Sequence, residues 1–216
     1  MGLLGHAARS PEGGPNKDPA GLDLLVVAAL GGSGSALDAL LAAVHPLALQ
    51  YCRARLGRHE TGLLSAEDVA QEVCVAVVKA LLTYEPSERS FRAFVYGIAS
   101  NKVADTFRSI ARNRTEPVAE LPDLPSAGQG PEDHMLQVEL GDWMGRLVSR
   151  LSARQREVIT LRVVMRLSAE ETAVIVGSTP GAVRVTQHRA LTRLREIIEA
   201  LPGAPSARPY RIVVGE

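Results

Sequence analysis

The chain has 216 residues, of which 46% are hydrophobic and 22% charged, a composition that provides packed cores and excludes a globally disordered protein. Only 4% are aromatic, so the cores must be built from Leu, Val, Ile and Ala, which favours packed helices over sheets. The formal net charge of zero excludes a protein that coats nucleic acid by charge alone, although it leaves room for local basic surfaces.

Apolar residues at helical spacing predict four helices in the first half of the chain, over 22–30, 36–56, 66–82 and 91–112. The residues before them, 1–20, are rich in Gly and Pro and are predicted to be a disordered tail. Pro46 predicts a kink or a boundary inside the second helix. Ser65 with Asp68 predicts a capped start for the third. Residues 21–112 therefore form the first predicted domain.

A segment rich in Pro and Gly follows these helices. Residues 113–131 are predicted to be a flexible linker, which reaches roughly 60 Å at most when extended. Helical spacing resumes over 132–200, the second predicted domain, and 201–216 are predicted to be a flexible tail. No segment shows a strand period of useful length. The predicted fold is all-α, with two small helical domains joined by a flexible linker.

The second domain carries its own helix signals. Helices are predicted over 132–150, over 152–164, after Ser168 and from Pro180 to about 200. Ser152 with Gln155 and Ser168 with Glu171 form the capping-box pattern at two of these starts. Gly177 ends the short helix, and Pro180 stands at a first helical position, where its missing N–H costs nothing.

The short helix, the turn at Gly177 and the longer helix together make a helix-turn-helix pattern. At 100° per residue, Val183, Ala190, Leu194 and Ile197 fall on one side of the last helix, which is the predicted core side. The opposite side carries Arg184, Val185, His188, Arg189 and Thr192. No acidic residue occurs from 181 to 195, which fits an approach to phosphate.

Roles follow from the chemistry of this face. Arg184 and Arg189 are expected to bind guanine or phosphate, and Val185 a thymine methyl. The helix N-terminus near Thr179 is expected to accept a phosphate through its free N–H groups. The alternative is a solvated, Arg-rich helix in an ordinary bundle, and the helix-turn-helix alone is shared by repressors and response regulators.

The order of the sequence motifs narrows the choice among classes of helix-turn-helix protein. The second domain reads LSARQREV from Leu151, LSAEETA from Leu167, GSTPGAVR from Gly177 and HRA from His188. These stretches resemble region 4 of the extracytoplasmic-function (ECF) sigma factors of the sigma-70 family. The first domain reads DVAQEV from Asp68 and FRAFVYGIASNKVAD from Phe91, which resemble regions 2.2 and 2.3 of the same family.

The resemblance covers roughly residues 22–200, and two stretches narrow it to a branch. Residues 51–57 (YCRARLG) and 184–190 (RVTQHRA) are most similar to the actinobacterial sigma-D-like branch, which includes ShbA. There are departures from the family pattern. Cys74 and Phe94 replace customary aromatics of region 2. Val185 and Thr186 replace a common Ser-Arg pair, so the upstream promoter sequence is expected to differ from the family's commonest one.

The resemblance implies three sets of contact residues. Those for the −35 promoter element are Thr179, Gly181, Arg184, Val185, His188 and Arg189. Those for the melted −10 element are Tyr84 as the stacking residue, Asn101 as the base-contacting amide, and Arg92, Lys102 and Arg108 for phosphate. Those for core RNA polymerase are Asp68, Gln71 and Glu72. The plain alternatives are that Tyr84 is a core aromatic, Asn101 a surface amide and the acidic residues a solvated helix start.

The implied partners are promoter DNA, core RNA polymerase through the largest subunit's clamp helices and the second subunit's flap, and an anti-sigma factor. No catalytic, metal or cofactor site is predicted, and Cys52 and Cys74 are expected to be buried free thiols. The chain lacks a membrane span and a signal peptide, so a soluble cytoplasmic protein is expected. Two other classes stay open: a helix-turn-helix regulator acting without polymerase, and an adaptor that binds only protein.

Overall fold

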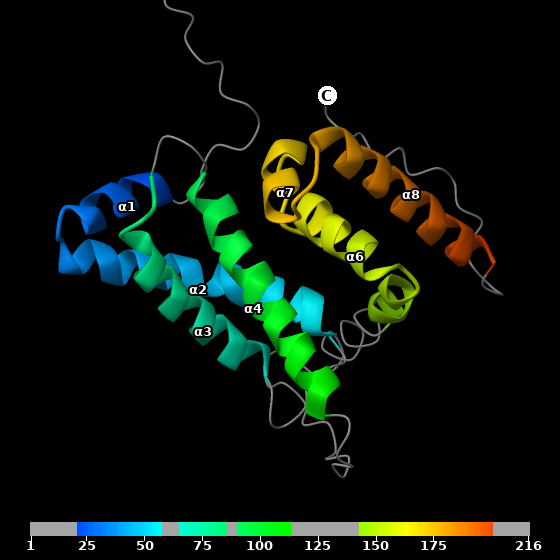
Figure 1. Ribbon diagram of the computed structural model, residues 1–216, viewed down its shortest axis with the longest axis horizontal. Helices are drawn as coiled ribbons and strands as arrows, with labels where there is room; N and C mark the ends of the chain where they lie inside the picture. Colours follow the sequence, from blue (N-terminus) through cyan, green and yellow to red (C-terminus); the bar gives the residue numbers. More distant parts are fainter. Residues whose placement is uncertain (1–20, 58–64, 86–89, 114–142, 201–216) are drawn as a thin grey trace, which may run out of the picture.

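The structure is a computed structural model that describes residues 21–57, 65–85, 90–113 and 143–200, and within these ranges the regular elements are all helical (Figure 1). The predicted tails, 1–20 and 201–216, lie outside the described residues. So do nearly all of the predicted linker and the first part of the helix predicted over 132–150, of which 143–149 are helical.

The first half of the chain forms the four predicted helices, which are α1 (Leu22–Leu30), α2 (Gly34–Leu56), α3 (Ala66–Leu81) and α4 (Phe91–Asn113). The helix α2 begins two residues earlier than predicted, because the Ser33 hydroxyl accepts a hydrogen bond from the Ala36 amide at 3.3 Å and caps it there. The boundary suggested at Pro46 is wrong, since the helix runs through it. Val44 and Ala48, on either side, are both fully buried, and this packing holds the helix across the missing N–H.

The capping signals read from the sequence are confirmed at three helix starts. Each box forms in both directions, with the side chain of the first residue accepting from a backbone N–H and the side chain of the third helical residue accepting in return. The pairs are Ser65 with Asp68, Ser152 with Gln155 and Ser168 with Glu171. These boxes fix the starts of α3 and of the two short helices that precede the last one.

The second half contains α6 (Ala153–Ile159), the π-helical turn η2 (Thr160–Val164), α7 (Ala169–Ile175) and α8 (Pro180–Glu199). The single α-helix predicted over 152–164 is therefore wrong in its second part. There the Met165 amide donates to the Thr160 carbonyl at 2.9 Å, five residues back. This wider turn brings Leu161, Met165 and Leu167 all to the buried side, each at most 1% exposed.

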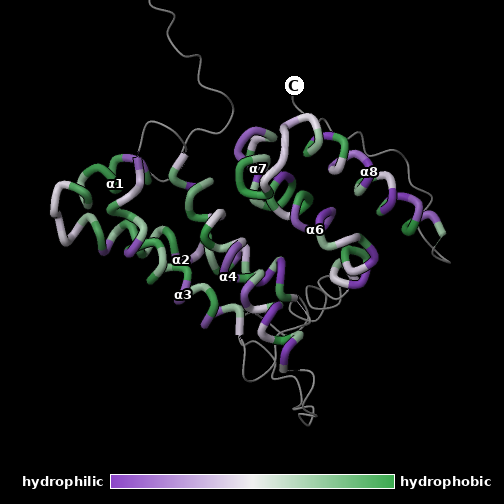
Figure 2. The backbone as a smooth tube through the Cα atoms, in the orientation of Figure 1, coloured by the Kyte–Doolittle hydropathy of each residue, from purple (hydrophilic) through white to green (hydrophobic). Residues whose placement is uncertain are grey.

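The two halves meet in the largest hydrophobic cluster, and the second half has two smaller clusters of its own. The largest buried cluster contains residues of α1–α4, and Leu161, Met165 and Leu167 of the second half belong to it. Cys52 is a free thiol buried in this core, as predicted, whereas Cys74, also a free thiol, is only partly buried. In Figure 1, α4 lies between the rest of the first half and α6 and α7, with α8 on the far side. Figure 2 shows long hydrophobic stretches in α1–α3 and more hydrophilic ones along α8.

Candidate nucleic-acid interface

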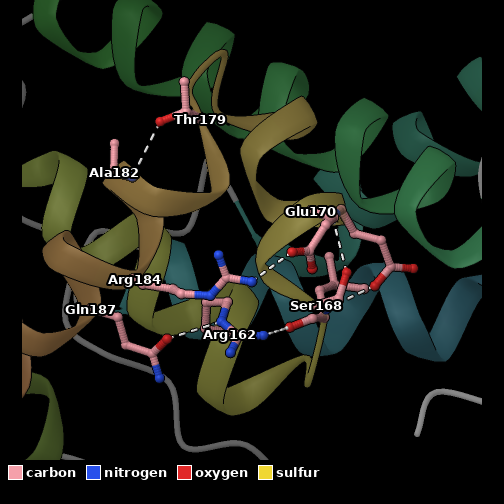
Figure 3. Close-up of polar contacts among 9 residues, drawn as sticks. Arg162, Ser168, Glu170, Thr179, Ala182, Arg184 and Gln187 are labelled. Carbon is pink, nitrogen blue, oxygen red and sulfur yellow. Dashed lines mark hydrogen bonds and ion pairs between the residues drawn. The ribbon is translucent and has the colours of Figure 1, made fainter. Parts of the chain in front are cut away.

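The helix-turn-helix is built as the sequence predicts. Gly177 takes the left-handed conformation (φ 59°) that ends α7, which a residue with a Cβ adopts only under strain. Thr179 then caps α8, its hydroxyl accepting a hydrogen bond from the Ala182 amide at 3.2 Å, and Pro180 stands at the first helical position (Figure 3). This turn fixes the direction in which α8 leaves α7.

The outer face of α8 is open to solvent. Val183 and Ala190 are buried, at 1% and 0% exposure, and they anchor the helix on α6 and α7. Arg184, His188 and Arg189 are exposed on the opposite side, and Val185 is 50% exposed. Thr179 and Gly181 are also exposed at the helix start. The residues predicted to contact the −35 element therefore lie together on one accessible surface.

Two polar contacts tie this surface to the preceding helices. The Arg184 guanidinium pairs with Glu170 of α7 at 2.6 Å, and Arg162 of η2 donates from Nε to the Gln187 side chain at 2.9 Å (Figure 3). A backbone hydrogen bond, and then Arg184, lower the pKa of Glu170 below its ordinary value. Because both partners of the Arg184 pair are more than half exposed, the pair is weak and able to open.

The acidic face predicted for polymerase binding lies on α3. Asp68, Gln71 and Glu72 are all exposed there. The Asp68 carboxylate also accepts from Ser65 in the capping box, with the two side-chain oxygens 2.9 Å apart, and Glu72 pairs with Lys102 of α4 at 3.1 Å. The role of Asp68 in capping α3 accounts for this residue as well as polymerase binding does. Among the described contacts, Gln71 has no capping role of this kind.

The residues predicted for the melted strand lie on α4 and just before it, and they are not equally accessible. Asn101 and Arg108 are exposed, and Arg108 pairs with Asp105 on the same helix. Arg92 is partly buried, and its guanidinium donates to the Met165 carbonyl at 3.0 Å. The expected phosphate contact of Arg92 therefore competes with a contact to the second half of the chain.

Tyr84 lies in an aromatic cluster. Its side chain is 7% exposed, and its ring centroid lies 5.2 Å from that of Phe91 and 4.9 Å from that of Phe94. Burial, and then the charge of Asp23, raise the pKa of Tyr84 to about 12. In this structure Tyr84 is therefore a core aromatic, the plain alternative to a stacking residue. Stacking on a flipped base would require its ring to leave the aromatic cluster.

A groove separates α4 from α7. It has a volume of about 450 Å³, and Asn101 lines it on the α4 side while Glu170, Glu171 and Val174 line it on the α7 side. Nothing in the sequence pattern indicates that α7 lies here, because the motifs place α4 and α7 in separate domains.

Sequence reasoning also missed a buried polar cluster between the halves. Glu157 of α6 pairs with Arg55 of α2 at 2.5 Å, and accepts hydrogen bonds from the hydroxyls of Ser100, at 3.0 Å, and Tyr51. The Arg55 and Glu157 side chains are only 10% and 12% exposed. Burial, and then the Glu157 charge, raise the pKa of Tyr51 far above its ordinary value.

The comparisons with known proteins agree with both halves of the fold. The chain matches the family models for Sigma-70 region 2 over residues 40–113 and for Sigma-70, region 4 over residues 142–194. It is 50% identical over 179 residues to the ECF RNA polymerase sigma factor SigD of Mycobacterium tuberculosis, covering 83% of this chain and 84% of that protein. It is 47% identical over 179 residues to ShbA of Streptomyces griseus, covering 81% of this chain and 94% of that protein.

Two solved structures of sigma factors resemble this chain in fold. That of CnrH in complex with the cytosolic domain of CnrY matches with a TM-score of 0.59 and 26% identity, covering 83% of this chain and 98% of that chain. The sigma factor RpoE from Bartonella quintana, solved with the anti-sigma factor NepR, shares the fold with a TM-score of 0.57 at 23% identity, over 75% of this chain and 96% of that chain.

A region 2 helical bundle followed by a region 4 helix-turn-helix defines a sigma factor of the sigma-70 type. Given relatives at 50% and 47% identity over more than four fifths of their length, this chain belongs to the ECF RNA polymerase sigma factors. It binds core RNA polymerase and directs initiation at specific promoters. A regulator acting without polymerase has no use for region 2, so that alternative is not favoured. Among the described residues, every helix is too short or too polar to cross a bilayer.

Proposed function

We propose that the outer face of α8 reads the −35 element, with Arg184 and Arg189 binding guanine or phosphate and Val185 contacting a thymine methyl. The observation that carries this proposal is one solvent-exposed surface that holds these three side chains and no carboxylate of its own helix between 181 and 195. The free N–H groups at the capped start of α8, near Thr179 and Gly181, are placed to receive a backbone phosphate.

The experiment for this surface is in vitro transcription from a promoter library with holoenzyme made from the wild type or from Arg189→Ala. The variant is expected to relax the preferred base at one or two upstream positions and to leave the −10 sequence unchanged. An unchanged upstream preference would remove Arg189 from the reading face. His188, exposed beside it, is tested in the same library as His188→Ala.

We propose further that α3 docks on the polymerase clamp helices through Asp68, Gln71 and Glu72, and that α4 receives the melted −10 strand. Asn101 would bind a flipped base, with Lys102 and Arg108 near its phosphates, and Tyr84 would stack on it after leaving its aromatic cluster. Support comes from the exposure of Gln71, Glu72 and Asn101. The phosphate role of Lys102 requires it to exchange its pair with Glu72 for DNA.

We propose, finally, that the protein acts in the cytoplasm without enzymatic activity of its own, and that an anti-sigma factor restrains it. The support is that CnrH and RpoE, which share its fold, were solved with the cytosolic domain of CnrY and with the anti-sigma factor NepR. Affinity purification from native cells is expected to recover a protein other than core polymerase in stoichiometric amount. Repeated recovery of core polymerase alone would count against this partner.

A further inference from the structure

We infer that Arg162 is a positioning residue for promoter binding, which holds the side-chain amide of Gln187 with its N–H groups outward, where they donate to a phosphate of the upstream duplex. Neither residue is among the −35 contacts expected from the sequence. The inference rests on the proposed binding of the −35 element by the outer face of α8, and it adds a contact at the edge of that face. The added contact sets affinity for the DNA backbone and not the choice of bases.

The guanidinium of Arg162 joins the start of α7 to the middle of α8. Its Nη1 donates to the Leu167 carbonyl, directly before the capping residue Ser168, and its Nε donates to Oε1 of Gln187 at 2.9 Å (Figure 3). A guanidinium is planar, and its donors point in fixed directions. Two acceptors from different segments therefore hold the group in one plane, and Arg162 is itself partly buried.

The backbone that carries Arg162 is held as firmly as its side chain. The Leu167 amide donates to the Leu161 carbonyl at 2.9 Å, so both polar backbone groups of Leu167 bond to η2. Just before Leu167, Arg166 takes a left-handed conformation (φ 58°), which costs energy for a residue with a Cβ and persists only where the surroundings fix it. Leu161 and Leu167 are at most 1% exposed and anchor this reversal in the core. Arg162 is thus a rigid support for Gln187.

The contact decides which way the Gln187 amide faces. A guanidinium carries only N–H donors, so the amide presents its oxygen to Arg162 and turns its nitrogen away, as Figure 3 shows. Among the contacts of the described residues, this nitrogen has no protein partner. Its two N–H groups are available to donate, and the hydrogen bond that the oxygen receives from a cation polarises them further. Gln187 therefore acts as a donor, and not as the donor–acceptor pair that binds adenine.

Gln187 lies at the border of the outer face of α8 that adjoins α7. At 100° per residue it stands about 40° from the buried Val183 and about 60° from the exposed Arg184, and the residue is partly exposed. Arg184, on the same border, pairs with Glu170 of α7. The first helix of a helix-turn-helix crosses the DNA backbone, while the second enters the major groove. Donors at the border between these helices therefore meet phosphate oxygens rather than base edges.

Arg162 also makes this border acceptable to phosphate. Glu170 lies nearby, and its carboxylate repels a phosphate once Arg184 leaves it for DNA. A backbone hydrogen bond, then Arg184 and finally Arg162 lower the pKa of Glu170 below its ordinary value, so Arg162 lies close enough to neutralise this carboxylate in part. Arg162 keeps its place through Leu167 and Gln187 whether or not Arg184 is bound to DNA.

Gln187→Glu separates this role from simple helix packing. The carboxylate keeps the shape of the side chain and pairs with Arg162 by charge, so the urea midpoint for unfolding of the full chain is expected to stay equal or to rise. It has no N–H donor and repels phosphate, so binding of a labelled upstream duplex by the holoenzyme is expected to weaken at least about tenfold. A side chain that only packed the helices would give unchanged or tighter binding, and that result would overturn the inference.

A double-mutant cycle tests whether Arg162 acts through Gln187. Gln187→Ala is expected to weaken duplex binding by about three- to tenfold, the loss of one hydrogen bond. The matched control is Arg154→Met, which removes the same charge from an arginine that holds the other end of α7 through the Val176 carbonyl. Arg162→Met is expected to weaken binding more than this control when residue 187 is Gln, and no more than the control when it is Ala. Equal factors for Arg162→Met in both backgrounds would contradict the positioning role.

A library of upstream promoter sequences distinguishes a phosphate contact from a base contact. Gln187→Ala is expected to weaken binding to all upstream sequences by one factor and, because the side chain is neutral, to leave the salt dependence of affinity unchanged. A changed preference at one base pair would contradict the phosphate contact.

Arg184→Ala in the same titration separates this inference from the proposed function. If Arg184→Ala weakens binding and Gln187→Glu does not, the inference is wrong while the −35 proposal stands. If neither variant weakens binding, the assignment of the −35 element to α8 fails, and the inference fails with it.

Discussion

Replacing Arg184 by Ala is expected to weaken binding to the upstream promoter element, whereas replacing Glu170 by Gln is expected to strengthen it. In the free protein the two side chains form an ion pair at 2.6 Å, and they are 59% and 62% exposed. An exposed pair of this kind contributes about 0.2–1 kcal/mol, because water screens it. A paired contact between arginine and guanine contributes about 1–3 kcal/mol, so the DNA contact outweighs the pair.

These magnitudes set the expected changes in affinity. Arg184→Ala should weaken binding by about 5- to 150-fold, and Glu170→Gln should tighten it by up to about fivefold, at tenfold per 1.4 kcal/mol. The control is Arg193→Ala, which also removes an arginine from an exposed pair on α8, but about 180° around the helix from Arg184. It is expected to change affinity by less than about twofold after the loss of one distant charge.

The assay is an equilibrium titration of a labelled upstream duplex with each variant holoenzyme at one fixed salt concentration, because phosphate contacts make affinity depend on salt. Weaker binding by Glu170→Gln would refute the reasoning, since it would mean that Glu170 holds Arg184 in its reading position rather than competing with DNA. Equal affinities for Arg184→Ala and Arg193→Ala would remove Arg184 from the contact surface.

Two further predictions concern α4 and the buried tyrosines. Asn101→Ala is expected to change the free energy of unfolding by less than about 0.5 kcal/mol, because the side chain is exposed. The same variant is expected to slow promoter opening on linear DNA. A normal opening rate, measured by permanganate footprinting, would mean that Asn101 is only a surface amide. Burial raises the pKa of Tyr51, Tyr84 and Tyr96 above the ordinary value of 10.0. Above that pH the unfolded chain releases phenolic protons that the folded chain keeps, so stability should fall as pH rises. The free energy of unfolding is measured by urea denaturation at several pH values above 10, with tyrosinate absorbance as a second signal. A free energy that stayed constant over this range would contradict the burial of these tyrosines.

The local structure was largely predictable from the sequence. Capping boxes such as Ser168 with Glu171 act over three residues, and the burial of Val183 and the exposure of Arg184 follow from the helical period of α8. The π-turn at 160–164 was not predictable. It is set by how Leu161 and Met165 pack against the first half of the chain, and a local period does not contain that contact.

Long-range contacts were beyond sequence reasoning for the same physical reason. Tyr51 and Glu157 are 106 positions apart, and a local sequence pattern holds no information about a contact over that separation. Tyr84 shows the difference clearly. The resemblance to the family implies a base-stacking role for Tyr84, but only the packed rings of Phe91 and Phe94 reveal that its side chain is buried. The sequence indicated the surfaces, while the structure indicates which of them are covered.

The most direct test of the central claim is run-off transcription with purified core RNA polymerase on a genomic promoter library, with and without this chain. The account predicts discrete transcripts that appear only when the chain is present and whose promoters share an upstream and a downstream element. Transcripts identical to those of core polymerase alone would contradict it, even if the chain bound duplex DNA, because binding without directed initiation is the behaviour of a helix-turn-helix regulator and not of a sigma factor.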